Sequence, residues 1–190
     1  MDRALAPLAS ASACNEGVRT LTLRATRTTD ADALADVFRA HHADVVRLAY
    51  LLCGDHERAE DLVADVFTKL YRRLQRGSVD NVRAYLRRSV VNQVNSSFRR
   101  LALERREAAR RRGDDRGVRA HADDVAERAA MLAALDRLPP RQRTAVVLRF
   151  YEDLSEREAA AVMGCSAGTV KSSLSRGLAK LRVLVSEEVS

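Results

Sequence analysis

The sequence predicts an all-α protein of two small helical domains joined by a flexible linker, and three observations support this fold class. Apolar residues recur at spacings of three and four through most of residues 30–187, which is the period of an amphipathic helix, whereas no stretch alternates as a strand does. Aromatic residues make up only 4% of the chain and Trp is absent, so the cores must be built mainly from Leu, Val and Ala. An Arg-rich segment divides the helical sequence in two.

Residues 30–103 are predicted to form the first domain, a bundle of three helices. Their apolar stripes cover residues 33–52, 59–74 and 86–98. A Gly-Asp pair separates the first two stripes, and a polar turn separates the second from the third. The third helix is expected to end near Leu103, where apolar residues become sparse.

Two segments are expected to lack a packed core. Residues 1–29 are small and polar with no amphipathic period, which predicts a disordered N-terminal extension. Residues 104–122 are predicted to form the linker, since the stretch 99–119 carries nine Arg against four acidic residues and contains Gly113 and Gly117.

Residues 123–187 are predicted to form the second domain, which ends in a helix-turn-helix. A Pro-Pro pair separates the first two helices of this block. Ser155 and Glu158 form a capping box at the start of the next helix, and Gly164 has the position of a residue that ends it. Ser166 is then expected to cap the last helix.

The last helix is expected to present a polar and basic face to solvent. Its residues carry hydroxyl groups or positive charge, with no acidic residue before Glu187. Such a face can enter the major groove of duplex DNA, contact phosphates and read base edges. The residues expected to contact DNA are Ser166, Thr169, Lys171, Ser172, Ser173, Ser175 and Arg176. The alternative is a helical hairpin with a solvated polar face.

Charge and composition favour a nucleic-acid partner. The net charge is +7 and Arg far outnumbers Lys, which suits phosphate binding, although a solvated basic surface has the same composition. Cys53 and His56 supply only two metal ligands, so no metal or other cofactor is expected. No apolar run approaches the ~20 residues of a membrane span, so we expect no membrane insertion and a cytoplasmic protein.

Two stretches together resemble the extracytoplasmic-function class of bacterial sigma factors, of the actinobacterial type. The first stretch, at residues 59–74 and 82–100, resembles sigma region two. It reads AEDLVADVFTKLYRRL and then VRAYLRRSVVNQVNSSFRR. The second stretch, at residues 135–182, resembles sigma region four. It reads LDRLPPRQRTAVVLRFYEDLSEREAAAVMGCSAGTVKSSLSRGLAKLR. The resemblance implies a non-enzymatic factor that binds the clamp and flap of core RNA polymerase and directs initiation at specific promoters. An anti-sigma factor is a further partner that it suggests.

The resemblance also implies roles for residues of the first domain. Region two captures the −10 promoter element as single strand, which requires aromatic stacking and positive charge. One face of the third helix supplies both, together with amides, in Tyr85, Arg88, Asn92, Asn95 and Arg99. Asn92 matches the family's Asn at the flipped −10 base, and the clamp contact maps onto Asp61 and Asp65 of the second helix. For each of these residues, a solvated surface position is the alternative.

The resemblance assigns the −35 element to the last helix, where Ser173 and Ser175 replace the larger or basic residues common in relatives. A different hypothesis is a stand-alone helix-turn-helix regulator that binds duplex DNA as a dimer. It leaves the block at residues 59–100 unexplained. An enzyme acting on nucleic acid is disfavoured, because neither a phosphate-binding Gly loop nor a catalytic constellation is recognisable.

Overall fold

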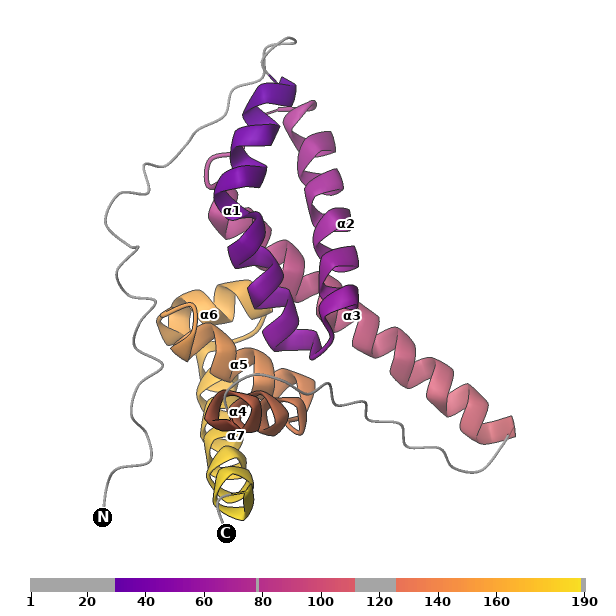
Figure 1. Cartoon of the computed structure of the whole chain (residues 1–190), viewed down its shortest axis with the longest axis vertical. Helices are drawn as coiled ribbons and strands as arrows, with labels where there is room; N and C mark the ends of the chain where they lie inside the picture. The colour runs from indigo at the N-terminus through magenta and orange to yellow at the C-terminus, as the bar shows by residue number, and fades with distance from the viewer. Residues whose placement is uncertain (1–29, 78, 112–125, 189–190) are drawn as a thin grey trace.

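The computed structural model describes residues 30–77, 79–111 and 126–188. The predicted extension at residues 1–29 and the predicted linker beyond residue 111 lie outside these described residues. Within the described part the chain forms seven α-helices and no β-strand, which confirms the all-α prediction (Figure 1). None of these helices combines the length and the apolarity needed to cross a membrane.

Three helices form the N-terminal unit: α1 spans Asp30–Cys53, α2 spans His56–Leu74 and α3 spans Val82–Arg111. Their apolar stripes meet as the sequence predicts. The fully buried side chains of this core include Leu48, Leu52, Val63, Val66, Leu70, Leu86, Val90 and Val94. The core holds the outer faces of α2 and α3 in fixed positions.

Short polar side chains begin the second and third helices. The Asp55 carboxylate accepts a hydrogen bond from the Arg58 backbone N–H at 2.9 Å, which caps α2. The Asn81 side chain accepts from the Ala84 backbone N–H at 2.9 Å at the start of α3. The helix then continues eight residues beyond its predicted end at Leu103, because Leu, Ala, Glu and Arg all favour helix in this stretch.

Four helices form the C-terminal unit: α4 spans Ala126–Asp136, α5 spans Pro140–Phe150, α6 spans Glu156–Met163 and α7 spans Ala167–Glu188. The predicted capping box is present, since Ser155 Oγ accepts from the Glu158 backbone N–H and the Glu158 carboxylate accepts from the Ser155 N–H. These hydrogen bonds lower the pKa of Glu158 below its ordinary value. Gly164 ends α6 in the left-handed conformation with φ 63°, as predicted.

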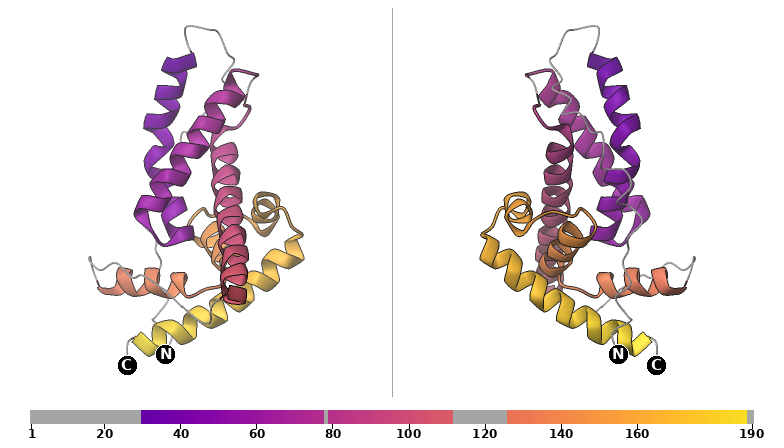
Figure 2. Two further views of the ribbon diagram at one scale, coloured as in Figure 1. Left: turned by 90° about the vertical axis from the view of Figure 1, so that its right-hand side faces the viewer. Right: turned by 90° about the vertical axis from the view of Figure 1, so that its left-hand side faces the viewer.

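The two units pack directly against each other. One continuous apolar cluster contains residues of both units, from Val37 on α1 to Val170 on α7. Both views of Figure 2 place α6 beside α3, in agreement with the contacts between these helices. The periodicity of each block predicted a core for that block, and it gave no sign of this shared surface.

Candidate nucleic-acid interface

The start of α7 carries a pair of hydroxyl groups that also stabilise the helix. Ser166 Oγ accepts a hydrogen bond from the Thr169 backbone N–H at 3.2 Å, which is the predicted cap. The same Oγ lies 2.9 Å from Thr169 Oγ1, so the two hydroxyls form one exposed polar group at the end of the helix. A helix N-terminus with free N–H groups and hydroxyls suits a phosphate oxygen.

The following turns of α7 continue this polar surface. Lys171, Ser172, Ser175 and Arg176 are exposed. Ser172 Oγ donates to the Thr169 carbonyl at 3.1 Å, whereas Lys171 and Arg176 form no ion pair with any other residue that the structure describes. Two unpaired cations beside hydroxyl groups form the surface expected of a major-groove helix.

Ser173 corrects one expectation about this face. Helical spacing predicts it on the exposed side of α7, but only 8% of its surface is accessible. It lies three residues after Val170 and four before Gly177, both of which are buried, so it faces inward with them. A Cβ atom on Gly177 would lie 3.0 Å from a Val146 methyl carbon, which reflects the close approach of α5 and α7 on that side. Ser173 therefore cannot contact DNA in this arrangement.

The second candidate surface lies on α3. Asn92 and Arg99 are exposed, while Tyr85 and Asn95 are half-buried. The Tyr85 ring packs against the edge of the apolar cluster. Arg88 is exposed, but its Nη2 donates a hydrogen bond to the Ala161 carbonyl of α6 at 2.6 Å. All five residues thus lie on α3, and one of them, Arg88, has a hydrogen-bond partner in the C-terminal unit.

The outer face of α2 carries Asp61 and Asp65, both exposed as expected. Asp65 accepts a hydrogen bond from Gln93 Nε2 of α3 at 2.9 Å, and the same amide accepts from Lys69 Nζ. One turn after Asp65, Thr68 lines an open groove of about 480 Å³ between α1 and α2. Its other lining residues are Leu34, Ala35, Phe38, Phe67 and Tyr71. The outer surface of α2 therefore offers acidic side chains and, toward α1, an apolar groove.

Arg143 is a structural residue that sequence reasoning missed. It is only 4% exposed on α5, and its Nη1 donates to the Leu52 carbonyl of α1 at 3.0 Å. The same nitrogen lies 2.8 Å from an Asp136 carboxylate oxygen, and the guanidinium carbon lies 5.9 Å from the centre of the Phe98 ring. Burial lowers the pKa of Arg143, and the Asp136 charge opposes that shift. Arg143 therefore connects α1, α3, α4 and α5.

The described residues offer no catalytic constellation. They contain no group of three or more His, Cys, Asp or Glu side chains able to hold a metal ion. Burial raises the pKa of the Cys53 thiol, whose Sγ lies 3.2 Å from the Asp55 carbonyl, so this thiol is protonated and a poor nucleophile at neutral pH.

Comparison with known families matches both units. Residues 37–104 match the family described as Sigma-70 region 2, and residues 128–181 match Sigma-70, region 4. The first match covers α2 and most of α1 and α3, and the second covers α6 and most of α7.

Individual proteins agree with these matches. The chain is 36% identical over 149 residues to the RNA polymerase sigma-E factor of Streptomyces antibioticus, covering 77% of this chain and 81% of that protein. It is 32% identical over 161 residues to the ECF RNA polymerase sigma factor EcfG of Rhodopseudomonas palustris, covering 81% of this chain and 86% of that protein.

A solved structure shows the same fold. The sigma factor RpoE of Bartonella quintana, in complex with the anti-sigma factor NepR, aligns with a TM-score of 0.65 at 24% identity and covers 82% of this chain and 98% of its own. Because both sigma regions match and the relatives are similar over most of their length, this chain belongs to the extracytoplasmic-function family of RNA polymerase sigma factors.

Proposed function

We propose that this sigma factor holds core RNA polymerase with α1 and α2, captures the −10 element on α3 and reads the −35 element with α7. The observation that carries this proposal is the presence of two separate polar and basic surfaces, on α3 and α7, in one chain. A regulator that binds only duplex DNA requires the α7 surface alone. The α3 surface has the aromatic, amide and cationic groups that unpaired bases require.

In the C-terminal unit, the proposed −35 contacts are polar residues at the start of α7 and on its outer face. They are the exposed Ser166, Lys171, Ser172, Ser175 and Arg176, together with the half-buried Thr169. The hydroxyl pair at the start of the helix would face phosphate, and the cations would reach phosphates or base edges. Ser173 is excluded because it is buried.

In the N-terminal unit, the proposed −10 contacts are Tyr85, Arg88, Asn92, Asn95 and Arg99. The Asn92 side chain is exposed, which suits contact with a flipped base. Flipping a base costs a few kcal/mol. The free energy of binding to polymerase and DNA would supply it, because the sequence carries no nucleotide-hydrolysis motif.

The proposed polymerase contact is the surface formed by Asp61, Asp65 and the neighbouring apolar groove. The clamp of core polymerase is the partner that family membership suggests for this surface, and the flap is the one it suggests for the C-terminal unit. An anti-sigma factor is a further proposed partner, supported by the complex in which RpoE of Bartonella quintana was solved. The factor would act in the cytoplasm, where polymerase and chromosome are found.

Run-off transcription tests the function. Purified protein and core polymerase from the same organism would be incubated with a genomic fragment library. We expect discrete transcripts that depend on the protein and weaken with Asn92→Ala. The absence of transcripts, together with tight binding of the protein alone to duplex DNA, would favour the helix-turn-helix regulator instead.

A further inference from the structure

The groove between α1 and α2 exposes aromatic side chains. Phe38 and Tyr71, which line it, are 43% and 36% exposed, although large apolar side chains are usually buried. The Phe38 ring packs against the Phe67 ring of α2 with 4.9 Å between centroids, so both helices contribute to one aromatic surface. A contiguous exposed apolar surface is typical of a site that binds another apolar segment.

The twelve residues before α1 combine apolar and basic side chains. Residues 18–29 read VRTLTLRATRTT, with three Arg and no acidic residue. Leu21 and Leu23 lie two positions apart, so an extended chain presents both on one side. The sixteen residues that precede this segment contain only one Arg, together with Asp2 and Glu16. Residues 18–29 are therefore the part of the N-terminal extension whose chemistry suits an apolar groove with an acidic neighbour.

The groove lies close to the point where this segment joins α1. The helices α1 and α2 run antiparallel, so that Leu34 near the start of α1 and Tyr71 near the end of α2 line the groove together (Figure 1). Phe38 lies eight residues after Asp30, or about 12 Å along the helix axis. Seven residues separate Leu23 from Asp30 and can span up to about 25 Å. The chain is thus long enough to turn back and place Leu23 against Phe38.

An acidic side chain lies where the docked segment would carry an arginine. Glu60 Oε2 lies 3.3 Å from His42 Nε2, and the His42 ring packs on Phe38 with 4.3 Å between centroids. The Glu60 side chain is 42% exposed, so a further cation can reach it. Glu60 lies about 10 Å along α2 from the ring that packs on Phe38. Arg19 lies four residues before Leu23, which can span about 14 Å, so it would reach Glu60.

Covalent attachment to α1 strengthens a weak contact of this kind. A short connection holds the segment at an effective concentration of the order of mM. An intrinsic Kd of about 1 mM would then leave the groove occupied in about half of the molecules, and a Kd of about 0.1 mM in about nine tenths of them. The groove belongs to the surface proposed to bind core polymerase, so an occupied groove would withhold that surface.

We infer that residues 18–29 dock in the groove between α1 and α2 and compete there with core polymerase. This inference rests on the proposed function, because the competition requires the polymerase contact proposed for this surface. Polymerase can bind only the fraction of molecules whose groove is free. Docking should therefore raise the apparent Kd for polymerase by about twofold to tenfold.

Site-specific photocrosslinking in the full chain tests the docking. Leu23 is replaced by the photoreactive amino acid p-benzoylphenylalanine, and mass spectrometry after irradiation locates the crosslinked peptide. We expect crosslinks to the residues of α1 and α2 that line the groove. Ala35→Arg, which places a long cation in the groove from an exposed position, should remove them. Ala40→Arg is the matched control, because Ala40 is also exposed on α1 but does not line the groove.

Crosslinks that survive Ala35→Arg, crosslinks outside the groove, or no crosslinks at all would overturn the inference. So would crosslinks between two molecules, detected in a mixture of isotopically light and heavy protein, because the occupant would then be a second copy of the chain. The irradiation requires neither polymerase nor DNA, so its result does not depend on the proposed function.

Binding of the full chain to immobilised core polymerase tests the competition. Leu21→Ser combined with Leu23→Ser weakens docking and should lower the Kd for polymerase by about twofold to tenfold. Leu5→Ser combined with Leu8→Ser makes the same change outside the docking segment and should leave the Kd unaltered. An equal Kd for these variants and the wild type would overturn the inference. No binding by any of them would contradict the proposed function and the competition with it, while the crosslinks would still show whether the segment docks.

Discussion

The guanidinium of Arg143 donates a hydrogen bond to the backbone carbonyl of Leu52, at 3.0 Å, and so joins α5 of the C-terminal unit to the end of α1. Both groups are buried, so neither can exchange this bond for one to water without the units moving apart. The terminal nitrogens of Arg143 have acceptors, whereas its buried Nε has no hydrogen-bond partner among the described residues, so the Leu52 and Asp136 contacts carry the compensation for burying this cation. The interface between the units is therefore specific as well as apolar, and its polar contacts can be tested singly.

Removing the Arg143 side chain should destabilise the protein. Arg143→Ala leaves the Leu52 carbonyl and the Asp136 carboxylate without their donor, and we expect a loss of roughly 2–3 kcal/mol in the free energy of unfolding. Urea denaturation followed by circular dichroism measures it. Arg141→Ala, on the exposed side of the same helix, should change stability by less than about 0.5 kcal/mol. Equal losses in the two variants would contradict a specific role for Arg143.

The turn between α1 and α2 should tolerate no side chain at Gly54. Gly54 has a φ of 76°, and an added Cβ would lie 2.6 Å from an Asp136 carboxylate oxygen. Gly54→Ala should therefore cost roughly 2 kcal/mol of stability, from backbone strain and displacement of Asp136. Gly77→Ala is the control, since nothing lies within 4 Å of a Cβ there. A Gly54→Ala protein as stable as the control would show that Asp136 moves away without cost.

Two neighbouring serines on α7 should differ in their effect on promoter recognition. Ser175 is exposed and Ser173 is buried, so only Ser175→Ala should weaken transcription that depends on the −35 element, by about threefold to tenfold. Run-off assays on templates with intact and scrambled −35 elements would separate this effect from loss of folding. A weakening in Ser173→Ala that is confined to the intact template would contradict the orientation of α7.

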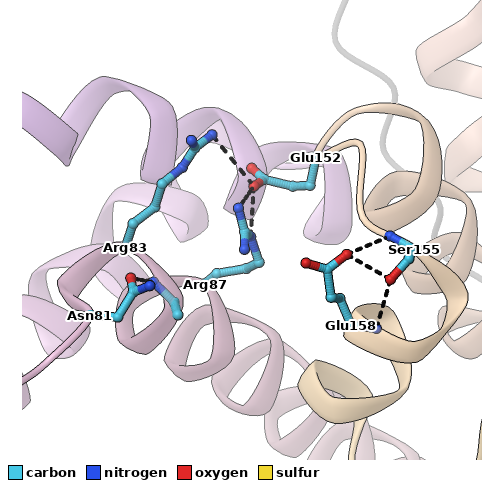
Figure 3. A network of polar contacts seen from close by, with 7 residues as sticks. Asn81, Arg83, Arg87, Glu152, Ser155 and Glu158 are labelled. Atoms are coloured by element: carbon cyan, nitrogen blue, oxygen red, sulfur yellow. Dashed lines mark hydrogen bonds and ion pairs between the residues drawn. The ribbon is translucent and has the colours of Figure 1, made fainter. Parts of the chain in front are cut away.

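His41 of α1 lies beside Arg83 of α3 and Glu152 of the α5–α6 loop, two residues that face each other in Figure 3, and the protein should lose stability there in mild acid. Burial lowers the pKa of His41 below its ordinary value of 6.5, Arg83 lowers it further, and Asp44 opposes the shift. The folded protein then binds fewer protons at His41 than the unfolded chain, so stability falls as the pH falls through about 6.5 toward the folded pKa.

His41→Gln removes this titration and leaves the other histidines in place. We expect the difference in unfolding free energy between about pH 7.5 and about pH 5.5 to be smaller in His41→Gln than in the wild type. Urea unfolding at both pH values measures the two differences. A pH dependence that is the same in both proteins would show that His41 titrates equally when folded and unfolded.

Local signals in the sequence predicted much of the fold. Ser155, Glu158 and Gly164 act through their own backbone neighbours, so their cap and helix end were predictable without tertiary information. The burial of Ser173 was not predictable from local signals, because it depends on how closely α5 approaches α7. The helix end predicted at Leu103 was placed too early, since loss of the apolar stripe ends the packing of a helix and not its backbone hydrogen bonds.

Contacts between the units were the least predictable feature. Arg143 and Glu152 are charged residues, and in a single sequence such residues are expected at the solvated surface. Their burial follows only from the packing of α5 and of the α5–α6 loop against α1 and α3. The residues of the proposed DNA surfaces come from helical periodicity together with the resemblance to sigma factors, and their contact with DNA stays a prediction.

Run-off transcription with core polymerase, comparing the wild type with Asn92→Ala and Gln75→Ala, tests the central claim most directly. Asn92 and Gln75 are both exposed amides of the N-terminal unit, but only Asn92 lies on the proposed −10 surface. We expect transcripts that require the wild-type protein, a loss of at least about tenfold with Asn92→Ala, and little change with Gln75→Ala. Equal activity of all three proteins would contradict capture of the −10 element by this face of α3, and no transcript from any of them would contradict initiation by this protein.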